Sequence, residues 1–334
     1  MTAREGGATP TTERTAMGAV RSATARVPAL GLAGLLLLMW IVAGVAVPSF
    51  ASVGNIVNIL QQSSDLVVAA LGVMFVLLVG GIDLSIGSVY GIGSVVVSSL
   101  VLAGAGVPLA VLVALAVAAL AGLVSGTLTH YGRIPSFIMT LGMYYVLLAV
   151  AQMLSNGAAL NLPAGTALQG LARGSILGVP ITVVVAAVVA VVAWLLLNRT
   201  VFGRRVISVG LNPETSRLSG IPVSRVIIGV FVLSSLFAGI ASVILTARVQ
   251  SGTPALGGLD STFEVITAAV VGGTSLFGGR GTVLGVVVGA LIIRTIGNCI
   301  TLLDISPLLY QAVMGSLILI ALIVEAIRTR QEAT

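Results

Sequence analysis

The stretch ITVVVAAVVAVVAWLLL at residues 181–197 contains one hydroxyl group, that of Thr182, among Ile, Val, Ala, Leu and a single Trp. With the residues before it, this stretch forms an apolar run over 176–197. A helix needs about 20 residues to cross the hydrocarbon core of a bilayer. Lipid offers no partner for backbone N–H and C=O groups, so the run must close its hydrogen bonds internally. The sequence therefore predicts a transmembrane helix here.

The rest of the chain has the same character. Hydrophobic residues make up 57% of the 334 residues, charged residues 8%, and the mean hydropathy is +1.17. In a soluble domain about a quarter of the residues are charged. The apolar runs lack the alternation of half-buried strands. We therefore predict an all-α, polytopic membrane protein.

Ten apolar segments are expected to cross the membrane, although some of them are broken or re-entrant. The second, eighth and ninth are short or interrupted by glycine, and we expect the eighth to be half a crossing or part of a re-entrant segment. The ten segments cover residues 29–47, 66–79, 86–105, 107–128, 134–154, 176–197, 226–247, 263–271, 283–296 and 309–327.

The basic residues predict the orientation. All sixteen are arginines, and the chain contains no lysine. Positive residues in short loops favour the cytoplasmic side of a membrane. Ten crossings that start inside place thirteen arginines in the cytoplasm, Arg173 and Arg248 outside, and Arg294 within a span. We therefore expect a bacterial inner-membrane protein with both termini in the cytoplasm.

The N-terminal region differs from the rest. Residues 1–28 are rich in Thr, Ala and Arg without hydrophobic periodicity, which predicts a disordered cytoplasmic tail. The apolar run that follows is long enough to span, and Pro48-Ser49-Phe50 is a poor cleavage site. We expect this run to be retained as an anchor, and residues 29–328 to form a single transmembrane domain.

The largest cytoplasmic break, residues 198–225, carries the signals of a short helix. Asn212 can cap it, Pro213 suits the first helical position, Glu214 suits the first turn, and Gly220 can end it. A helix of about two turns is not stable alone and needs a partner surface. The acidic residue and the small residues favour docking to a protein, and the alternative is an amphipathic loop helix on lipid headgroups.

A second interruption is VGGIDLSIGS at residues 79–88. Asp83 or Ser85 can cap the helix that follows. That structural role is the favoured interpretation, because a charged residue at a membrane boundary is only a weak sign of function.

A third interruption is VGGTSLFGGRGT at residues 271–282, which superficially suggests a phosphate-binding loop. A Walker loop needs a lysine that reaches the phosphates. Because the chain has no lysine, we interpret Arg280 as a cytoplasmic anchor and expect no ATPase site in this chain.

These three interruptions together resemble the ribose-type sugar permeases of ABC importers, in the family of monosaccharide and branched-chain amino acid importer permeases. The resemblance extends over about residues 30–328, with the motifs in the family's order. Arg280 stands where the family often has lysine and Phe277 replaces a smaller residue, but the charge and the glycines remain. The motif residues are Gly80, Gly81, Asp83, Ser85, Gly272, Gly273, Gly278, Gly279 and Arg280.

The resemblance implies a permease that pairs with a second permease subunit, usually an identical copy, around a central pathway. It also implies an ATPase partner, expected to carry two cassettes and to hold the ATP and Mg²⁺, since this chain needs no cofactor or metal of its own. An extracytoplasmic binding protein would deliver a ribose-like pentose or a hexose. The coupling helix that seats in the ATPase would comprise Asn212, Pro213, Glu214, Thr215, Arg217, Leu218 and Gly220.

Polar residues in or beside the spans are candidates for contact with the solute, because intramembrane polar groups face a cavity or another helix. Interhelical hydrogen bonding is the alternative, and Glu264 with Arg294 can be a structural ion pair. The candidates for the pathway are Asn58, Gln61, Gln62, Asp65, Tyr144, Gln152, Glu264, Arg294 and Asn298. Asn55, Ser63, Ser64 and Tyr145 are polar neighbours of these residues in the sequence.

Other functions receive less support. His130 and Cys299 are the only residues of their types, so one chain offers no His/Cys metal cluster. The net charge of +6 follows from membrane topology and indicates no nucleic-acid partner. Two alternatives stay open: an ABC permease for a branched-chain amino acid or a nucleoside, and an ion-coupled secondary transporter that would use Asp65 and Glu264.

Overall fold

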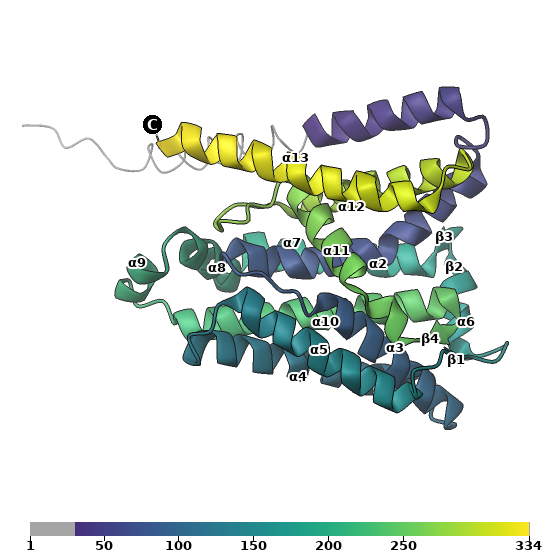
Figure 1. The fold of residues 1–334 in the computed structure, drawn as a ribbon, viewed down its shortest axis with the longest axis horizontal. Helices are drawn as coiled ribbons and strands as arrows, with labels where there is room; N and C mark the ends of the chain where they lie inside the picture. Colours follow the sequence, from purple (N-terminus) through teal and green to yellow (C-terminus); the bar gives the residue numbers. More distant parts are fainter. Residues whose placement is uncertain (1–30, 334) are drawn as a thin grey trace, which may run out of the picture.

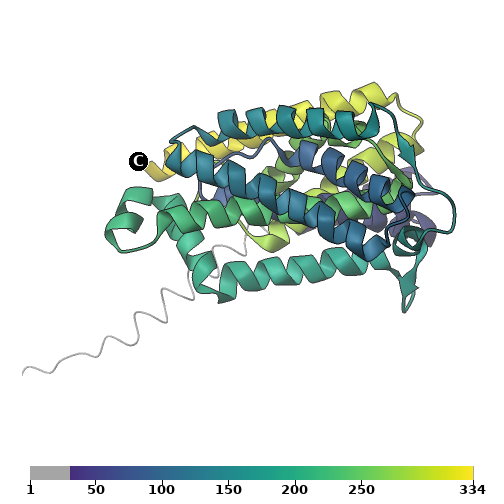
Figure 2. The same ribbon diagram turned by 90° about the horizontal axis from the view of Figure 1, so that it is seen from below.

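The computed structural model describes residues 31–333, which form a bundle of helices aligned roughly along one axis (Figure 1). The tail predicted at residues 1–28 lies outside the described residues. One end of the bundle carries the short helix α9 and the end of α13 (Figure 1). The opposite end carries the short strands and α6, and the view turned by 90° shows the same two ends (Figure 2).

The first apolar segment is the helix Gly31–Ala46. The other elements are α2 (Val53–Leu78), α3 (Ile86–Leu102), α4 (Val107–Tyr131), α5 (Ser136–Ser155), β1 (Leu160–Asn161), α6 (Ala167–Arg173), β2 (Ser175–Ile176), β3 (Val179–Pro180), α7 (Ile181–Arg199), α8 (Val201–Leu211), α9 (Pro213–Leu218), α10 (Val223–Val249), β4 (Ser251–Gly252), the 3₁₀ helix η1 (Pro254–Gly257), α11 (Leu259–Val271), α12 (Val283–Leu302) and α13 (Pro307–Ala333). Strand β1 pairs antiparallel with β4, and β2 with β3.

Each of the ten predicted apolar segments lies on a helix, but some predicted boundaries are wrong. The second segment was expected to begin at Leu66, whereas α2 begins at Val53 and includes the polar residues before Asp65. Asn55 and the Gln61 carbonyl bond to neighbouring helices, and other polar side chains bond within α2, so the helix continues through them. The sixth was expected to begin at Ile176, whereas that residue belongs to the β2–β3 hairpin and α7 starts at Ile181.

Among the described residues, six helices are long and apolar enough to cross a bilayer: α2, α4, α5, α7, α10 and α12. Shorter apolar helices lie at Gly31–Ala46, Ile86–Leu102 and Leu308–Ile320. The chain is therefore a multi-pass membrane protein built from helices.

Helix α2 forms the centre of the bundle, and 83% of its most apolar 18-residue stretch is buried. It contacts α10, α12, α7 and α11. Helix α10 in turn packs closely against α4, because a Cβ at Gly126 would lie 2.8 Å from the Cα of Ile228. Small residues allow this close approach of helices in lipid, where packing replaces the hydrophobic driving force.

Two crossings are interrupted inside the bundle. Residues 79–85 are irregular before α3 begins, and β4 with η1 precedes α11. The two helices begin beside each other, because the backbone N–H of Gly87 donates to the Thr262 hydroxyl at 3.0 Å. Helix α11 has 13 residues, which is about 20 Å and shorter than the hydrocarbon core. The helix is thus as short as a half crossing or re-entrant segment would be, and that path stays a prediction.

Candidate functional site

The predicted helix at residues 213–218 is present as α9. The Asn212 carboxamide oxygen accepts a hydrogen bond from the backbone N–H of Thr215 at 2.8 Å, as an N-cap does. Gly220 has a φ of +76°, so a residue without Cβ ends the helix. Glu214 and Arg217 form an exposed ion pair at 2.7 Å. The cap, the first turn and the stop are therefore confirmed as structural features.

Helix α9 presents its longer side chains to the outside. Glu214 and Arg217 are 66% and 69% exposed, and Leu218 is 79% exposed. Ser216 faces the protein and is buried. The helix lies at the tip of the bundle (Figure 1). A short, capped helix that exposes an ion pair and an apolar residue next to it can serve as a contact surface for another protein.

The glycine motifs join this segment to the bundle core. The backbone N–H of Gly279 donates to the carbonyl of Leu78 at 2.8 Å. A Cβ at Gly210 would overlap the same carbonyl oxygen, and a Cβ at Gly278 would lie 2.7 Å from the Gly210 oxygen and 3.1 Å from the Gly80 nitrogen. The structure therefore brings both glycine motifs and the end of α8 into one glycine junction, formed by Gly80, Gly210, Gly278 and Gly279.

Other motif residues have more local roles. A Cβ at Gly272 would lie 2.5 Å from the Gly285 oxygen, so this glycine lets α11 approach α12. Gly273 has a φ of +83°, which favours glycine at that turn. Gly81 lies against Val76 of α2, and Arg280 is exposed.

Asp83 is fully buried and bound by three donors. Its Oδ1 accepts from the Ser85 backbone N–H at 3.0 Å and the Ser85 hydroxyl at 2.6 Å, and its Oδ2 accepts from the Ser234 hydroxyl at 3.1 Å. The Ser85 side chain makes no cap hydrogen bond to α3. The carboxylate therefore fixes residues 79–85 against α10. Its partners on this segment lie before Ile86, where α3 begins, so neither Asp83 nor Ser85 caps the helix with its side chain, and that prediction is wrong.

Several polar candidates meet in an ion network. Asp65 of α2, 2% exposed, accepts from Arg248 of α10 at 2.9 Å and from Arg294 of α12 at 3.3 Å. Arg294 also pairs with Glu264 of α11 at 2.7 Å, which confirms the ion pair expected between them. The Tyr310 hydroxyl of α13 donates to Glu264 at 2.6 Å. This network of two carboxylates, two guanidinium groups and a phenol joins five helices.

The remaining polar residues of α2 lie around this network. Asn55 and Asn298 exchange hydrogen bonds of 3.0 and 2.8 Å, and the Gln61 carbonyl accepts from Arg248 at 3.4 Å. Gln62 donates to Asn58 within the same helix at 3.0 Å. Ser63 and Ser64 bond to the backbone one turn earlier. Asn55 and Asn298 thus form an interhelical hydrogen bond, which was the alternative to contact with the solute.

The candidates on α5 lie apart from the network. Tyr144 is buried near Leu259 and Asp260, at the start of α11. Tyr145 and Gln152 are exposed on the same helix.

Several residues of the site could not be found from the sequence. Arg248 was expected only to mark the outer side, yet its side chain turns to Asp65. Tyr310 and Tyr90 lie in apolar runs without a motif, although Tyr90 donates to the Asp65 carbonyl at 3.1 Å. Gly210 had no signal other than its place before the predicted cap.

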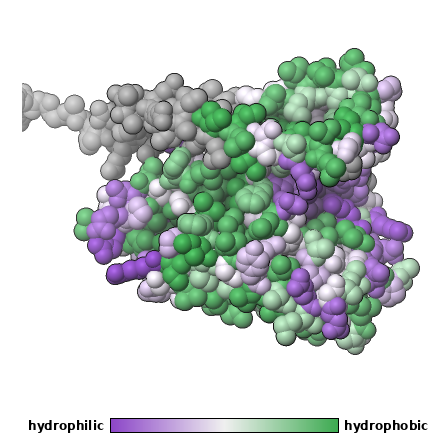
Figure 3. All heavy atoms as spheres, viewed as in Figure 1, coloured by the Kyte–Doolittle hydropathy of each residue, from purple (hydrophilic) through white to green (hydrophobic). Residues whose placement is uncertain are grey.

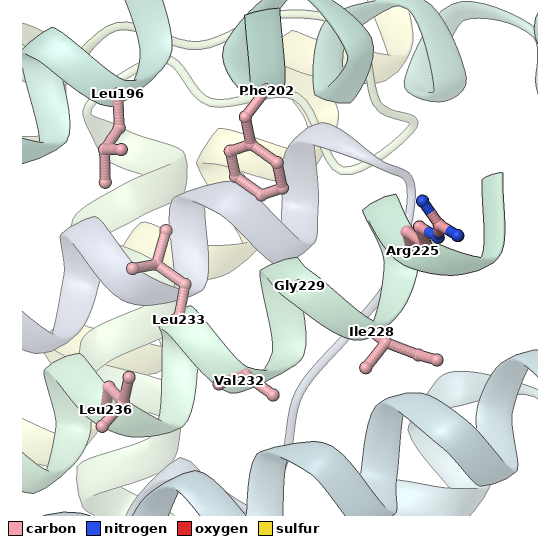
Figure 4. A pocket seen from close by; sticks show the side chains of 8 residues that line it. All are labelled: Leu196, Phe202, Arg225, Ile228, Gly229, Val232, Leu233 and Leu236. Atoms are coloured by element: carbon pink, nitrogen blue, oxygen red, sulfur yellow. The ribbon is translucent and has the colours of Figure 1, made fainter. Parts of the chain in front are cut away.

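A pocket of about 450 Å³ lies between α7, α8 and α10. Figure 4 shows Phe202, Leu196 and Leu233 around it, with Arg225 at one side. Arg225 is the one charged group among its lining residues. A polyhydroxylated solute needs many hydrogen-bond partners, so this apolar pocket is a poor candidate for a sugar site.

The comparisons with known proteins give the family. The model of the branched-chain amino acid transport system permease component matches residues 55–322. The chain belongs to this family. The permease is 37% identical over 297 residues to a ribose import permease protein of Escherichia coli (strain K12), with 88% of this chain and 92% of the relative covered.

Two further relatives are also named as sugar permeases. The ribose import permease protein of Bacillus subtilis (strain 168) is 35% identical over 293 residues, with 87% of this permease and 90% of the relative covered. The L-arabinose ABC transporter permease protein of Azospirillum brasilense is 35% identical over 302 residues, with 90% of this permease and 88% of the relative covered. No solved structure matches this chain.

Proposed function

We propose that this permease is the membrane-spanning subunit of an ATP-driven importer for a monosaccharide. The observation that carries the proposal is the similarity, over almost the whole chain, to permeases named for ribose and arabinose. A D-allose transport system permease protein of Escherichia coli (strain K12) is also 32% identical over 275 residues. A ribose-like pentose or a hexose is therefore the proposed solute, and its choice rests with the binding protein.

The proposed assembly contains two copies of this chain, an ATPase subunit with two cassettes, and an extracytoplasmic sugar-binding protein. ATP and Mg²⁺ bind to the ATPase subunit. The exposed face of α9 supports a docking role for the segment from Asn212 to Gly220. Its ion pair and its exposed Leu218 offer a polar and an apolar contact to a groove in the partner.

The proposed topology has ten crossings with both termini and residues 198–225 in the bacterial cytoplasm. The arginines support it, because Arg204, Arg205, Arg217 and Arg225 all belong to the segment around α8 and α9. The opposite end of the bundle carries Arg173, at the end of α6. This distribution follows the bias of positive charge toward the cytoplasm.

The proposed mechanism is alternating access. A push on α9 passes directly into α10, because only a short turn separates Leu218 from Val223. Helix α10 carries the push along its length to Arg248 and the ion network. The glycine junction transmits the same displacement to the end of α2. A ligand shifts such an equilibrium by binding one state better than the other.

The alternatives differ in chemistry. A permease for a branched-chain amino acid or a nucleoside fits the family's general description, whereas the relatives above are named for sugars. An ion-coupled transporter would need a carboxylate that is free to take up a cation. Asp65 and Glu264 are both bound by arginine, which favours a structural role.

Co-purification in mild detergent tests the proposed assembly. Affinity-tagged permease, isolated from its own cells and analysed by mass spectrometry, should retain a two-cassette ATPase and a second, untagged copy of the chain. Uptake by the same cells should be competed by D-ribose, L-arabinose or D-allose and not by leucine or adenosine. Competition by leucine alone would assign the permease to amino acids.

A further inference from the structure

An aromatic and polar patch lies on the uncovered face of α11 and at the start of α13. Phe263 is 45% exposed, and Asp260 and Gln311 are also exposed. The Gln311 amide lies 3.5 Å from the Asp260 carboxylate. Asp260 and Phe263 are three residues apart, so they share one face of the helix. Figure 3 shows hydrophilic side chains gathered between α13 and the helices beneath it.

The position of this patch along the bundle follows from its neighbours on α12. Helix α11 runs antiparallel to α12, since Gly272 meets Gly285 and Glu264 meets Arg294. Tyr310, the neighbour of Gln311, lies against Gly297. Helix α12 continues to Leu302, so the patch is beside its second half and not beyond its end.

The exposed Asp260 carboxylate indicates what surrounds the patch. A charged side chain within a bilayer faces the bundle interior or a water-filled cavity, because facing lipid is costly. The Asp260 side chain meets Gln311 of α13 and lies near Tyr144 of α5, yet it stays exposed, as Phe263 does. The face of α11 therefore borders water or a second permease subunit, as a wall of a central pathway does.

We propose that Phe263, Asp260 and Gln311 form a contact site for the sugar in the pathway, an inference that rests on the proposed function. A carboxylate accepts hydrogen bonds from hydroxyl groups, and an amide both donates and accepts. The phenyl ring offers an apolar face to the C–H groups of a sugar ring. The three side chains together match a neutral molecule with many hydroxyl groups and an apolar face.

The charges near the patch favour a sugar over an amino acid. An amino acid substrate brings a carboxylate, which needs a cationic partner. Arg294 and Arg248, the arginines of the neighbouring ion network, are already held by Asp65 and Glu264. The patch itself carries an acidic group, which would repel that carboxylate.

The test uses the complete transporter, reconstituted with its ATPase and binding protein in proteoliposomes, with radiolabelled D-ribose, L-arabinose and D-allose as probes. Phe263→Leu keeps an apolar side chain and removes the ring. We expect it to lower the uptake rate of the transported sugar about 3- to 10-fold, the range of one aromatic contact. Phe263→Tyr restores the ring, and we expect it to restore uptake to within about twofold of the unmodified protein.

Trp194→Leu is the matched control, since it removes a 42% exposed aromatic side chain from α7 and should leave uptake unchanged. Thermal unfolding of each purified variant shows whether it is folded. Full uptake by folded Phe263→Leu, or equal losses for the Leu and Tyr variants, would overturn the sugar contact alone. If the unmodified transporter moves none of the three sugars, the proposed function itself fails.

Discussion

At the residue scale, the structure depends on a few close approaches and a few buried charges. Gly210 and Gly278 let three backbone segments touch where a Cβ would overlap a carbonyl or a nitrogen. Asp65 and Arg294 form an ion pair inside the bundle. Each close approach depends on one missing Cβ and each ion pair on one charge, so single substitutions test them.

Gly210→Ala should destabilise the permease. The added methyl group would overlap the carbonyl of Leu78, so α8 must shift away from α2. Overpacking of this kind costs about 1–3 kcal/mol. We expect a lower unfolding temperature of the protein purified in detergent, together with slower uptake. Gly142→Ala is the control, because nothing lies within 4 Å of a Cβ there; equal unfolding temperatures for the two variants would contradict the glycine junction.

Arg294→Gln should cost far more stability than Arg217→Gln. The first leaves the buried carboxylate of Asp65 and the partly buried one of Glu264 without this partner, and breaking a buried pair costs about 3–5 kcal/mol. The second removes an exposed ion pair worth about 0–1 kcal/mol. Thermal unfolding of both purified variants measures the difference. A similar small loss in both would show that the network contributes little.

At the element scale, α9 and α10 are joined by the short turn between Leu218 and Val223 and form the proposed route from the ATPase to the bundle. The capped α9 is the exposed end, and α10 carries Arg248 at its far end. The sequence predicted α9 well, because Asn212, Pro213 and Gly220 are local signals whose effect does not depend on the rest of the fold. It missed α8, whose cap Thr200 was hidden inside a segment interpreted as a loop.

Exchanging the charges of α9 tests its docking role. The double variant Glu214→Lys with Arg217→Glu keeps an ion pair within the helix but reverses the charges offered to a partner. We expect it to abolish ATP-dependent uptake and to leave the unfolding temperature unchanged, because both side chains are exposed. Co-purification of the ATPase measures the binding itself. Unchanged sugar accumulation in this variant would count against docking through α9.

Helix boundaries show where sequence reasoning stops. Long apolar runs predicted the six helices of residues 31–333 that are long and apolar enough to span, because lipid permits little else. The first half of α2 was missed, since Asn55, Gln61 and Asp65 look like a loop until their partners on α10 and α12 are known. Pairings between residues far apart in the chain carry no local signal, so the ion network could be predicted only as far as Glu264 with Arg294.

At the scale of the whole molecule, two groups of residues lie at different positions along the bundle. The α9 end holds the glycine junction and most of the loop arginines, whereas the ion network and the patch around Phe263 lie away from that end, within the bundle. In the proposed mechanism, displacement of one end therefore travels through α2 and α10 to the other. The family and the membrane location could be predicted from motifs and composition. The face that we propose to border the pathway could not, because it depends on which side chains stay exposed once the helices have packed.

The most direct measurement is sugar accumulation in proteoliposomes under controlled sources of energy. We expect accumulation only when the ATPase subunit, the binding protein and ATP are all present, and none when the permease alone faces a proton or sodium gradient. Concentration of sugar by the permease alone, driven by either gradient without nucleotide, would contradict the role of this chain as a pathway powered by another subunit.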